Sequence, residues 1–152
     1  MFVKNSFALE MKCKFEEVYL NGQTTNGFIL IKNENLRYEY FDKKLFGLIY
    51  KENQLFQFDN SKINIVRKIN QQKELFESLH NLFKNYPNIS NEYKINEYTI
   101  NIFNSNVSNF IQRISIKSKK LNLSLYLVDC KKTSISDIFF NASPAIRYYY
   151  YE

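Results

Sequence analysis

Short stretches in which apolar and polar residues alternate recur along most of the chain, and polar turns separate them. The first covers residues 7–20, where the letters FALEMKCKF place apolar and charged side chains at opposite parities. Alternation with a period of two is typical of a strand that buries one face. Further stretches lie at 28–32, 36–41, 45–51, 54–59, 63–69, 92–103, 110–118, 121–129 and 132–141. The pattern predicts about ten antiparallel strands joined by short turns.

One segment, residues 71–87, has a different period. It reads QQKELFESLHNLFKNYP, and its apolar residues are Leu75, Phe76, Leu79, Leu82, Phe83 and Tyr86. That spacing is typical of one face of an amphipathic helix, which Pro87 would end. His80 lies beside this face, and we expect a partly exposed helix residue there. One helix inserted after the sixth strand indicates an α+β fold.

The segment LFGLIY at 45–50 carries more apolar residues than a sheet with one buried face requires. Its bulky side chains occupy both parities, and the neighbouring segments at 27–32 and 54–58 share this feature. Two interpretations remain open from the pattern. The inner face of the sheet is an ordinary core closed by the helix, or it encloses a cavity that accepts an apolar ligand.

The composition favours a soluble globular protein. The 152 residues suit one domain, residues 1–152, and 45% are hydrophobic and 17% aromatic with a mean hydropathy of −0.42. The formal net charge of +6 is scattered along the chain, so we expect no nucleic-acid partner. No apolar run approaches the roughly 20 residues that span a bilayer, and no signal peptide is visible.

Residues that could support catalysis are scarce. The chain has one histidine, two cysteines and three glycines, and it contains no phosphate-binding or nucleophile motif. We therefore expect no enzyme activity, no cofactor and no metal site. Cys13 and Cys130 are far apart in sequence. Two unpaired buried thiols are the favoured interpretation, and a disulfide is the alternative in an oxidising compartment.

The stretch from Gly27 to Arg67 resembles the LolA family of outer-membrane lipoprotein carriers. It reads GFILIKNENLRYEYFDKKLFGLIYKENQLFQFDNSKINIVR. In that family a glycine opens a strand, a turn follows, and the next strand reads apolar-Arg-aromatic-Glu-Tyr, which is similar to residues 36–40 here. The segment LIYKENQLFQF is similar to the family's next hairpin. The resemblance covers about residues 9–84. The family's Arg-Pro turn is KNEN here, so the role of that arginine does not transfer.

The resemblance implies a strongly curved antiparallel sheet, an incomplete β-barrel covered by one or more helices that act as a lid. It implies a monomeric periplasmic carrier, or chaperone, for acylated lipoproteins. Such a carrier receives its cargo from an inner-membrane lipoprotein-release transporter and delivers it to an outer-membrane acceptor. By this resemblance we expect the chain to lack the family's N-terminal helix and signal peptide. The alternatives are a β-sheet interaction module or a general lipid-binding protein.

Alternation and this resemblance together select the residues that would contact a ligand. Leu36, Tyr38 and Tyr40 share one parity, and we expect them to face the cavity. The full predicted set is Leu36, Tyr38, Tyr40, Phe56, Phe58, Leu75, Leu79 and Leu82. Arg37 and Glu39 have the opposite parity, so we expect them on the outer surface, where they pair across strands with little effect on stability.

Overall fold

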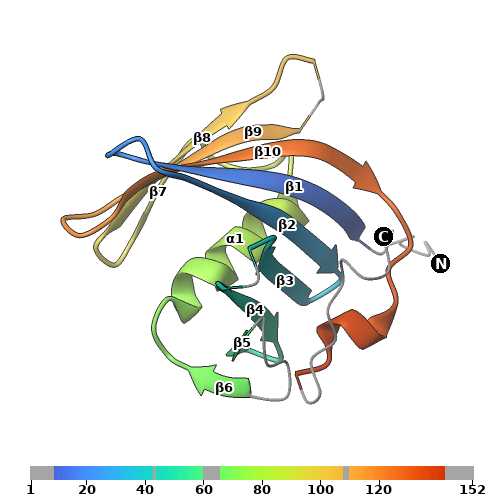
Figure 1. Cartoon of the computed structure of the whole chain (residues 1–152). Helices are drawn as coiled ribbons and strands as arrows, with labels where there is room; N and C mark the ends of the chain where they lie inside the picture. The colour runs from blue at the N-terminus through green and yellow to red at the C-terminus, as the bar shows by residue number, and fades with distance from the viewer. Residues whose placement is uncertain (1–8, 43, 60–65, 108–109, 143–152) are drawn as a thin grey trace.

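A computed structural model describes residues 9–42, 44–59, 66–107 and 110–142, and within them the chain forms one large sheet (Figure 1). The strands are β1 (Glu10–Tyr19), β2 (Thr24–Lys32), β3 (Asn35–Tyr40), β4 (Phe46–Lys51), β5 (Gln54–Asp59), β6 (Val66–Ile69), β7 (Glu92–Ile95), β8 (Tyr98–Asn104), β9 (Ile111–Lys117) and β10 (Asn122–Lys132). One α-helix, α1 (Lys73–Asn85), and one short 3₁₀ helix, η1 (Asp137–Phe140), complete the described elements.

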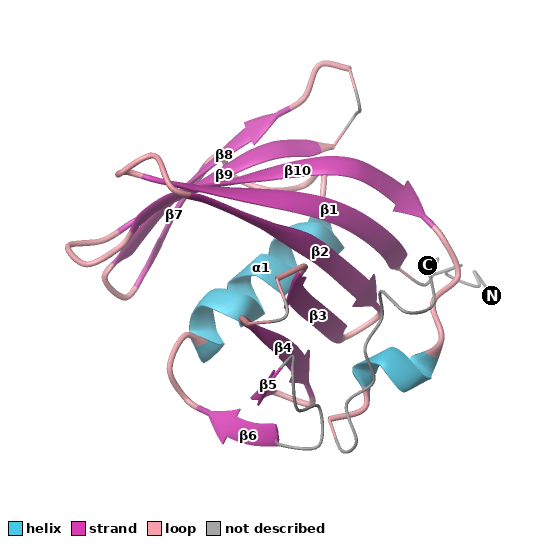
Figure 2. Cartoon of the chain, viewed as in Figure 1, coloured by secondary structure: helices cyan, strands magenta, loops and turns pink. Residues whose placement is uncertain are grey.

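All ten strands belong to the same antiparallel sheet, in the order β6-β5-β4-β3-β2-β1-β10-β9-β8-β7. Each half of the chain forms a meander, and the first and last strands pair to join the two halves. The helix α1 connects the two edge strands, β6 and β7, and lies against one face of the sheet (Figure 2). Because the edge strands do not pair with each other, the sheet is open.

The expected fold class is therefore wrong. We expected an α+β fold, an incomplete β-barrel with helices as a lid, and the described residues form mostly one open ten-stranded antiparallel sheet with a single short α-helix. The helix predicted within residues 71–87 is present as α1, and two of its side chains contact the turn between β2 and β3. His80 is buried rather than partly exposed, and its Nε2 lies 2.6 Å from the carbonyl oxygen of Asn33. Lys84 of α1 forms an ion pair with Glu34, which lies next to Asn33 in the turn between β2 and β3.

Asparagine and glutamate residues shape three two-residue hairpin turns. Asn33, Glu52, Asn53 and Asn96 have positive φ angles between 52° and 59°. Tight hairpins need this left-handed conformation because it matches the twist of the flanking strands, and asparagine adopts it readily. The turns β2–β3, β4–β5 and β7–β8 therefore lie where the sequence has its Asn-Glu and Glu-Asn pairs.

The two faces of the sheet carry separate cores, and this explains the surplus of apolar residues in LFGLIY. We call the face covered by α1 the inner face and the opposite one the outer face. Leu48 and Tyr50 belong to the inner core, whereas Ile49 packs with Phe58 on the outer face. Gly47 leaves room for the Phe58 ring, because a Cβ there would lie 2.1 Å from a ring carbon. Much of the surplus therefore serves packing on both faces.

The segment around η1 covers part of the outer face, where we expected a last strand between residues 132 and 141. Phe139 and Phe140 are buried against Phe28 and Leu30 of β2, together with Ile135. These hydrophobic contacts turn the segment onto the face of the sheet, so it does not extend the edge. Lys32 donates a hydrogen bond of 2.6 Å to the carbonyl of Ile135, which strengthens the attachment.

Arg37 and Glu39 lie beneath this segment, and our expectation that they are exposed is wrong. Both side chains have no exposed surface. Arg37 Nε and Nη2 each lie 2.7 Å from Glu39 Oε2, so the pair forms within β3 rather than across strands. Arg37 Nη1 donates to the carbonyl oxygen of Phe139 at 2.8 Å, and the guanidinium lies 4.9 Å from the centre of the Phe58 ring. Burial lowers the pKa of Arg37, and Glu39 opposes that shift.

A disulfide joins the two halves of the sheet. Cys13 of β1 and Cys130 of β10 are bonded at the place where the register between these strands shifts. The interpretation of two unpaired thiols is therefore wrong. The bond closes a loop between residues 117 positions apart in the sequence.

None of the helices in the described part of the chain is long and apolar enough to cross a membrane.

Candidate functional site

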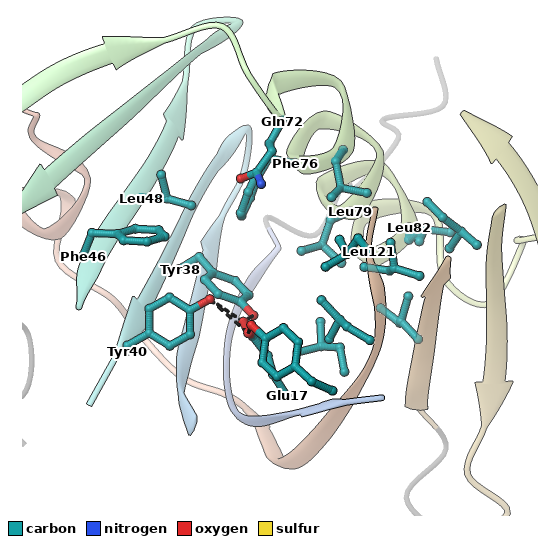
Figure 3. Close-up of a pocket in the computed structure, with 17 residues that line it drawn as sticks. Glu17, Tyr38, Tyr40, Phe46, Leu48, Gln72, Phe76, Leu79, Leu82 and Leu121 are labelled. Atoms are coloured by element: carbon teal, nitrogen blue, oxygen red, sulfur yellow. Dashed lines mark hydrogen bonds between the residues drawn. The ribbon is translucent and has the colours of Figure 1, made fainter. Parts of the chain in front are cut away.

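A cavity of about 190 Å³ lies between α1 and the inner face of the sheet. Its walls come from both halves of the sheet, because β1, β3 and β4 line it together with β8, β9 and β10. Leucine and isoleucine side chains form most of the lining, and Phe76, Leu79 and Leu82 reach it from α1 (Figure 3). Leu75 of the same helix also lines the cavity. The cavity is therefore a predominantly apolar space inside the protein's main core.

The lining residues differ in exposure, and this difference locates the mouth of the cavity. Most lining residues are buried, among them Leu79, Ile114 and Leu125. Leu75 at the start of α1 and Leu121 before β10 are half-buried, so the cavity meets solvent near them.

One polar cluster lies in this apolar wall, centred on Glu17 of β1, which is 2% exposed. The Tyr38 hydroxyl donates to Glu17 Oε1 at 2.7 Å, and the Tyr19 hydroxyl donates to Oε2 at 2.7 Å. Tyr40 donates to the same carboxylate, 3.0 Å from Oε2, and Thr25 donates to Oε2 at 3.2 Å. Both carboxylate oxygens accept hydrogen bonds, which is the pattern of an ionised carboxylate.

The tyrosines of this cluster remain protonated donors over a wide pH range. Burial, followed by the charge of Glu17, raises the pKa of Tyr38 and of Tyr40 well above the ordinary tyrosine value. Burial and the hydrogen bond to Glu17 raise the pKa of Tyr19 to about 12. The hydroxyl groups therefore satisfy the carboxylate without neutralising its charge.

Aromatic rings hold the cluster in position. Phe15 stacks on Tyr38 with ring centres 4.3 Å apart, and Tyr40 meets Phe46 edge to face at 5.5 Å. Phe76 of α1 meets Tyr38 edge to face at 5.5 Å. These contacts fix the side chains so that Tyr38 and Tyr40 converge on Glu17 from one side of the cavity (Figure 3).

A second cavity of about 220 Å³ adjoins the first. It lies between the C-terminal half of α1 and the β7–β8 hairpin, and Leu82 and Ile100 line both cavities. Asn81, Asn85 and Tyr93 give its lining a more polar character. The two spaces, about 410 Å³ together, are therefore separated by a shared apolar wall.

The structure brings together most of the predicted ligand-contacting residues. Tyr38, Tyr40, Leu75, Leu79 and Leu82 line the first cavity. Leu36 is buried in the inner core but does not line the cavity.

The two phenylalanines of β5 are the exceptions. In the register between β4 and β5, Leu48 of the inner face lies opposite Gln57, so Gln57 also points to the inner face. Phe58 and half-buried Phe56 have the other parity and therefore point to the outer face. The expectation that Phe56 and Phe58 face the cavity is therefore wrong.

Sequence reasoning missed Glu17, although a signal for it existed. Met11, Cys13 and Phe15 are buried on the inner face, and continuing that parity leads to Glu17 and Tyr19. A charged residue at an inward parity is unusual because burying an isolated charge is costly. Parity alone could therefore have marked Glu17 as a candidate polar site.

The described residues include no group of three or more His, Cys, Asp or Glu side chains that could hold a metal ion. Comparison of the sequence with models of known protein families and with curated proteins finds no match.

Proposed function

We propose that this protein is a carrier that binds the acyl chain of a lipidated molecule in the cavity beneath α1. The observation that carries the proposal is the apolar cavity itself, which is lined from both halves of the sheet and meets solvent beside Leu75 and Leu121. A cavity of this kind favours hydrocarbon because apolar walls offer no competing hydrogen bonds and hold water poorly.

The volume determines how much of a chain can enter. Apolar cavities of about 150 Å³ in other proteins accept benzene, which has six carbons. On that scale the first cavity, at about 190 Å³, holds about eight carbons. Both cavities together, at about 410 Å³, match about sixteen carbons. A long acyl chain would therefore cross the wall formed by Leu82 and Ile100.

The resulting affinity suits a carrier, which must release its cargo. Each buried CH₂ group contributes about 0.8 kcal/mol, so about seven such groups contribute roughly 5.5 kcal/mol. This corresponds to a dissociation constant on the order of 0.1 mM for a chain that fills only the first cavity. A chain that reaches the second cavity would bind more tightly.

We propose an acylated lipoprotein as the cargo and the periplasm as the compartment. The resemblance of residues 27–67 to lipoprotein carriers supports the cargo, and the Cys13–Cys130 disulfide supports an oxidising compartment. An inner-membrane release transporter would then supply the cargo, and an outer-membrane acceptor would receive it.

The test is displacement of an environment-sensitive dye by primary alcohols of increasing chain length. We expect saturable binding whose affinity rises up to about sixteen carbons. A rise that stops near eight carbons would confine the ligand to the first cavity. Leu79→Phe places a ring in the cavity and should weaken binding of the eight-carbon alcohol at least about tenfold.

The matched control is Leu20→Phe, because Leu20 is 81% exposed in the β1–β2 turn. This variant should bind alcohols like the parent protein, and thermal melting should show that both variants fold. Absence of saturable alcohol binding to the parent protein would reject the carrier proposal and favour a packed β-sheet interaction module.

A further inference from the structure

We propose that Glu17 makes the cavity selective for amphiphiles with a protonated amine next to the apolar chain, and that it excludes free fatty acids. This inference rests on the proposed function, because it assigns the head group of the same ligand. It would favour a lipidated peptide with a free amino group over a free carboxylate of equal chain length.

The first argument is the charge balance of the cavity. Glu17 is the sole charged side chain among the described residues that line it. Within the described part of the chain, Glu17 accepts its side-chain hydrogen bonds from the hydroxyl groups of Tyr19, Thr25, Tyr38 and Tyr40, and no ion pair there includes it. Hydroxyl groups satisfy the lone pairs of a carboxylate but leave its negative charge uncompensated, so a cation from the ligand would find a complementary field.

The second argument is the kind of surface around the carboxylate. The rings of Tyr38 and Tyr40, with centroids 5.6 Å apart and an interplanar angle of 80°, line the cavity beside Glu17. Phe46 extends this aromatic wall toward the mouth. Aromatic faces attract an ammonium group through their quadrupole, so the wall and the carboxylate favour the same head group.

The third argument concerns the position of the cluster along the cavity. Tyr19 and Tyr40 are half-buried and Glu17 is buried, so the cluster extends from the carboxylate toward the more exposed part of the lining. A ligand whose chain lies against the leucine and isoleucine side chains can therefore place its head group at Glu17. A carboxylate head would place a second negative charge beside Glu17, which disfavours binding in a medium of low dielectric constant.

The experiment compares octylamine, octanol and octanoate by dye displacement at neutral pH, where the amine and the acid are both ionised. We expect the amine to bind about tenfold more tightly than the alcohol, and the acid to bind more weakly than the alcohol. The net charge of +6 would by itself attract the acid, so a preference for the amine reports the local site.

The variant Glu17→Gln keeps the shape of the side chain and removes its charge. We expect it to bind the amine and the alcohol with affinities within about twofold of each other, and thermal melting should show that it folds. Equal binding of all three probes to the parent protein would overturn this inference and leave the carrier proposal intact. An amine preference that survives in Glu17→Gln would also overturn it. Failure of octanol to bind would instead reject the carrier proposal.

Discussion

Replacing Arg37 by methionine would remove the guanidinium that links β3 to the segment around η1. The substitution keeps a long apolar stem but deletes the 2.7 Å contacts with Glu39 and the 2.8 Å hydrogen bond to the carbonyl of Phe139. It also removes the cation from above the Phe58 ring. Glu39 would remain with no exposed surface and without its cation.

The expected loss follows from that burial. Removing one partner of a buried ion pair costs about 3–5 kcal/mol of unfolding free energy, because the remaining charge stays buried without the cation that paired with it. For a protein of this size, such a loss lowers the melting temperature by roughly 10 °C. The hydrogen bond to Phe139 contributes about 1.5–3 kcal/mol of the total, because its donor is charged.

A second substitution separates the charge effect from the loss of packing. The double variant Arg37→Met with Glu39→Met removes the buried carboxylate as well, so we expect about 2 kcal/mol more stability than in Arg37→Met alone. Arg113→Met is the matched control. Arg113 is half-buried and lies 3.9 Å from the centre of the Phe103 ring, and its loss should cost less than about 1 kcal/mol.

Urea unfolding followed by circular dichroism measures all four proteins under the same conditions. Hydrogen exchange of residues 135–140 would show whether the η1 segment loosens in Arg37→Met. A loss below about 1 kcal/mol in Arg37→Met, or a double variant less stable than the single one, would refute the reasoning.

Two further predictions concern the disulfide and the tyrosine cluster. Reducing the Cys13–Cys130 bond, whose ends lie 117 positions apart, should lower the free energy of unfolding by up to about 5 kcal/mol in urea titrations with and without reductant. Detection of free thiols in the unreduced protein would contradict the presence of this disulfide. Folding raises the pKa of Tyr19 to about 12, whereas an unfolded tyrosine has a pKa of about 10. The contribution of Tyr19 to the free energy of unfolding is therefore complete below about pH 10 and is lost as the pH rises through about 12. Replacing Tyr19 by phenylalanine should weaken this decrease, and an unchanged alkaline profile would contradict the assignment.

The local elements were predictable because their signals lie within a few neighbouring residues. Alternation marked the stretches in which β1 to β10 lie, although one stretch at 92–103 holds both β7 and β8, and the apolar spacing from Leu75 to Tyr86 placed α1. The Asn33-Glu34 and Glu52-Asn53 pairs marked two of the hairpin turns, and asparagine suits such turns because it tolerates positive φ. Parity also placed Tyr38 and Tyr40 on the inner face, where they line the cavity.

Residues 132–141 show why part of the prediction failed. Their apolar residues fit a strand pattern, yet Ile135, Phe139 and Phe140 pack onto the outer face of β2. A pattern within one segment does not reveal which distant surface is available for burial. The sequence pattern did not show that this segment covers the outer face. For that reason Arg37 and Glu39 were expected to be exposed, and the apolar residues of LFGLIY were interpreted as extra surface for a ligand.

The sequence by itself determined the periodicity of each segment, its turns, and the side chains that share one face of a strand, because these depend on backbone geometry over short distances. Only the tertiary structure decided the pairing of β1 with β10, the Cys13–Cys130 bond, the register that turns Phe58 outward, and the burial of Glu17 beside a cavity. These features depend on contacts between residues far apart in the chain, whose energies no local pattern contains.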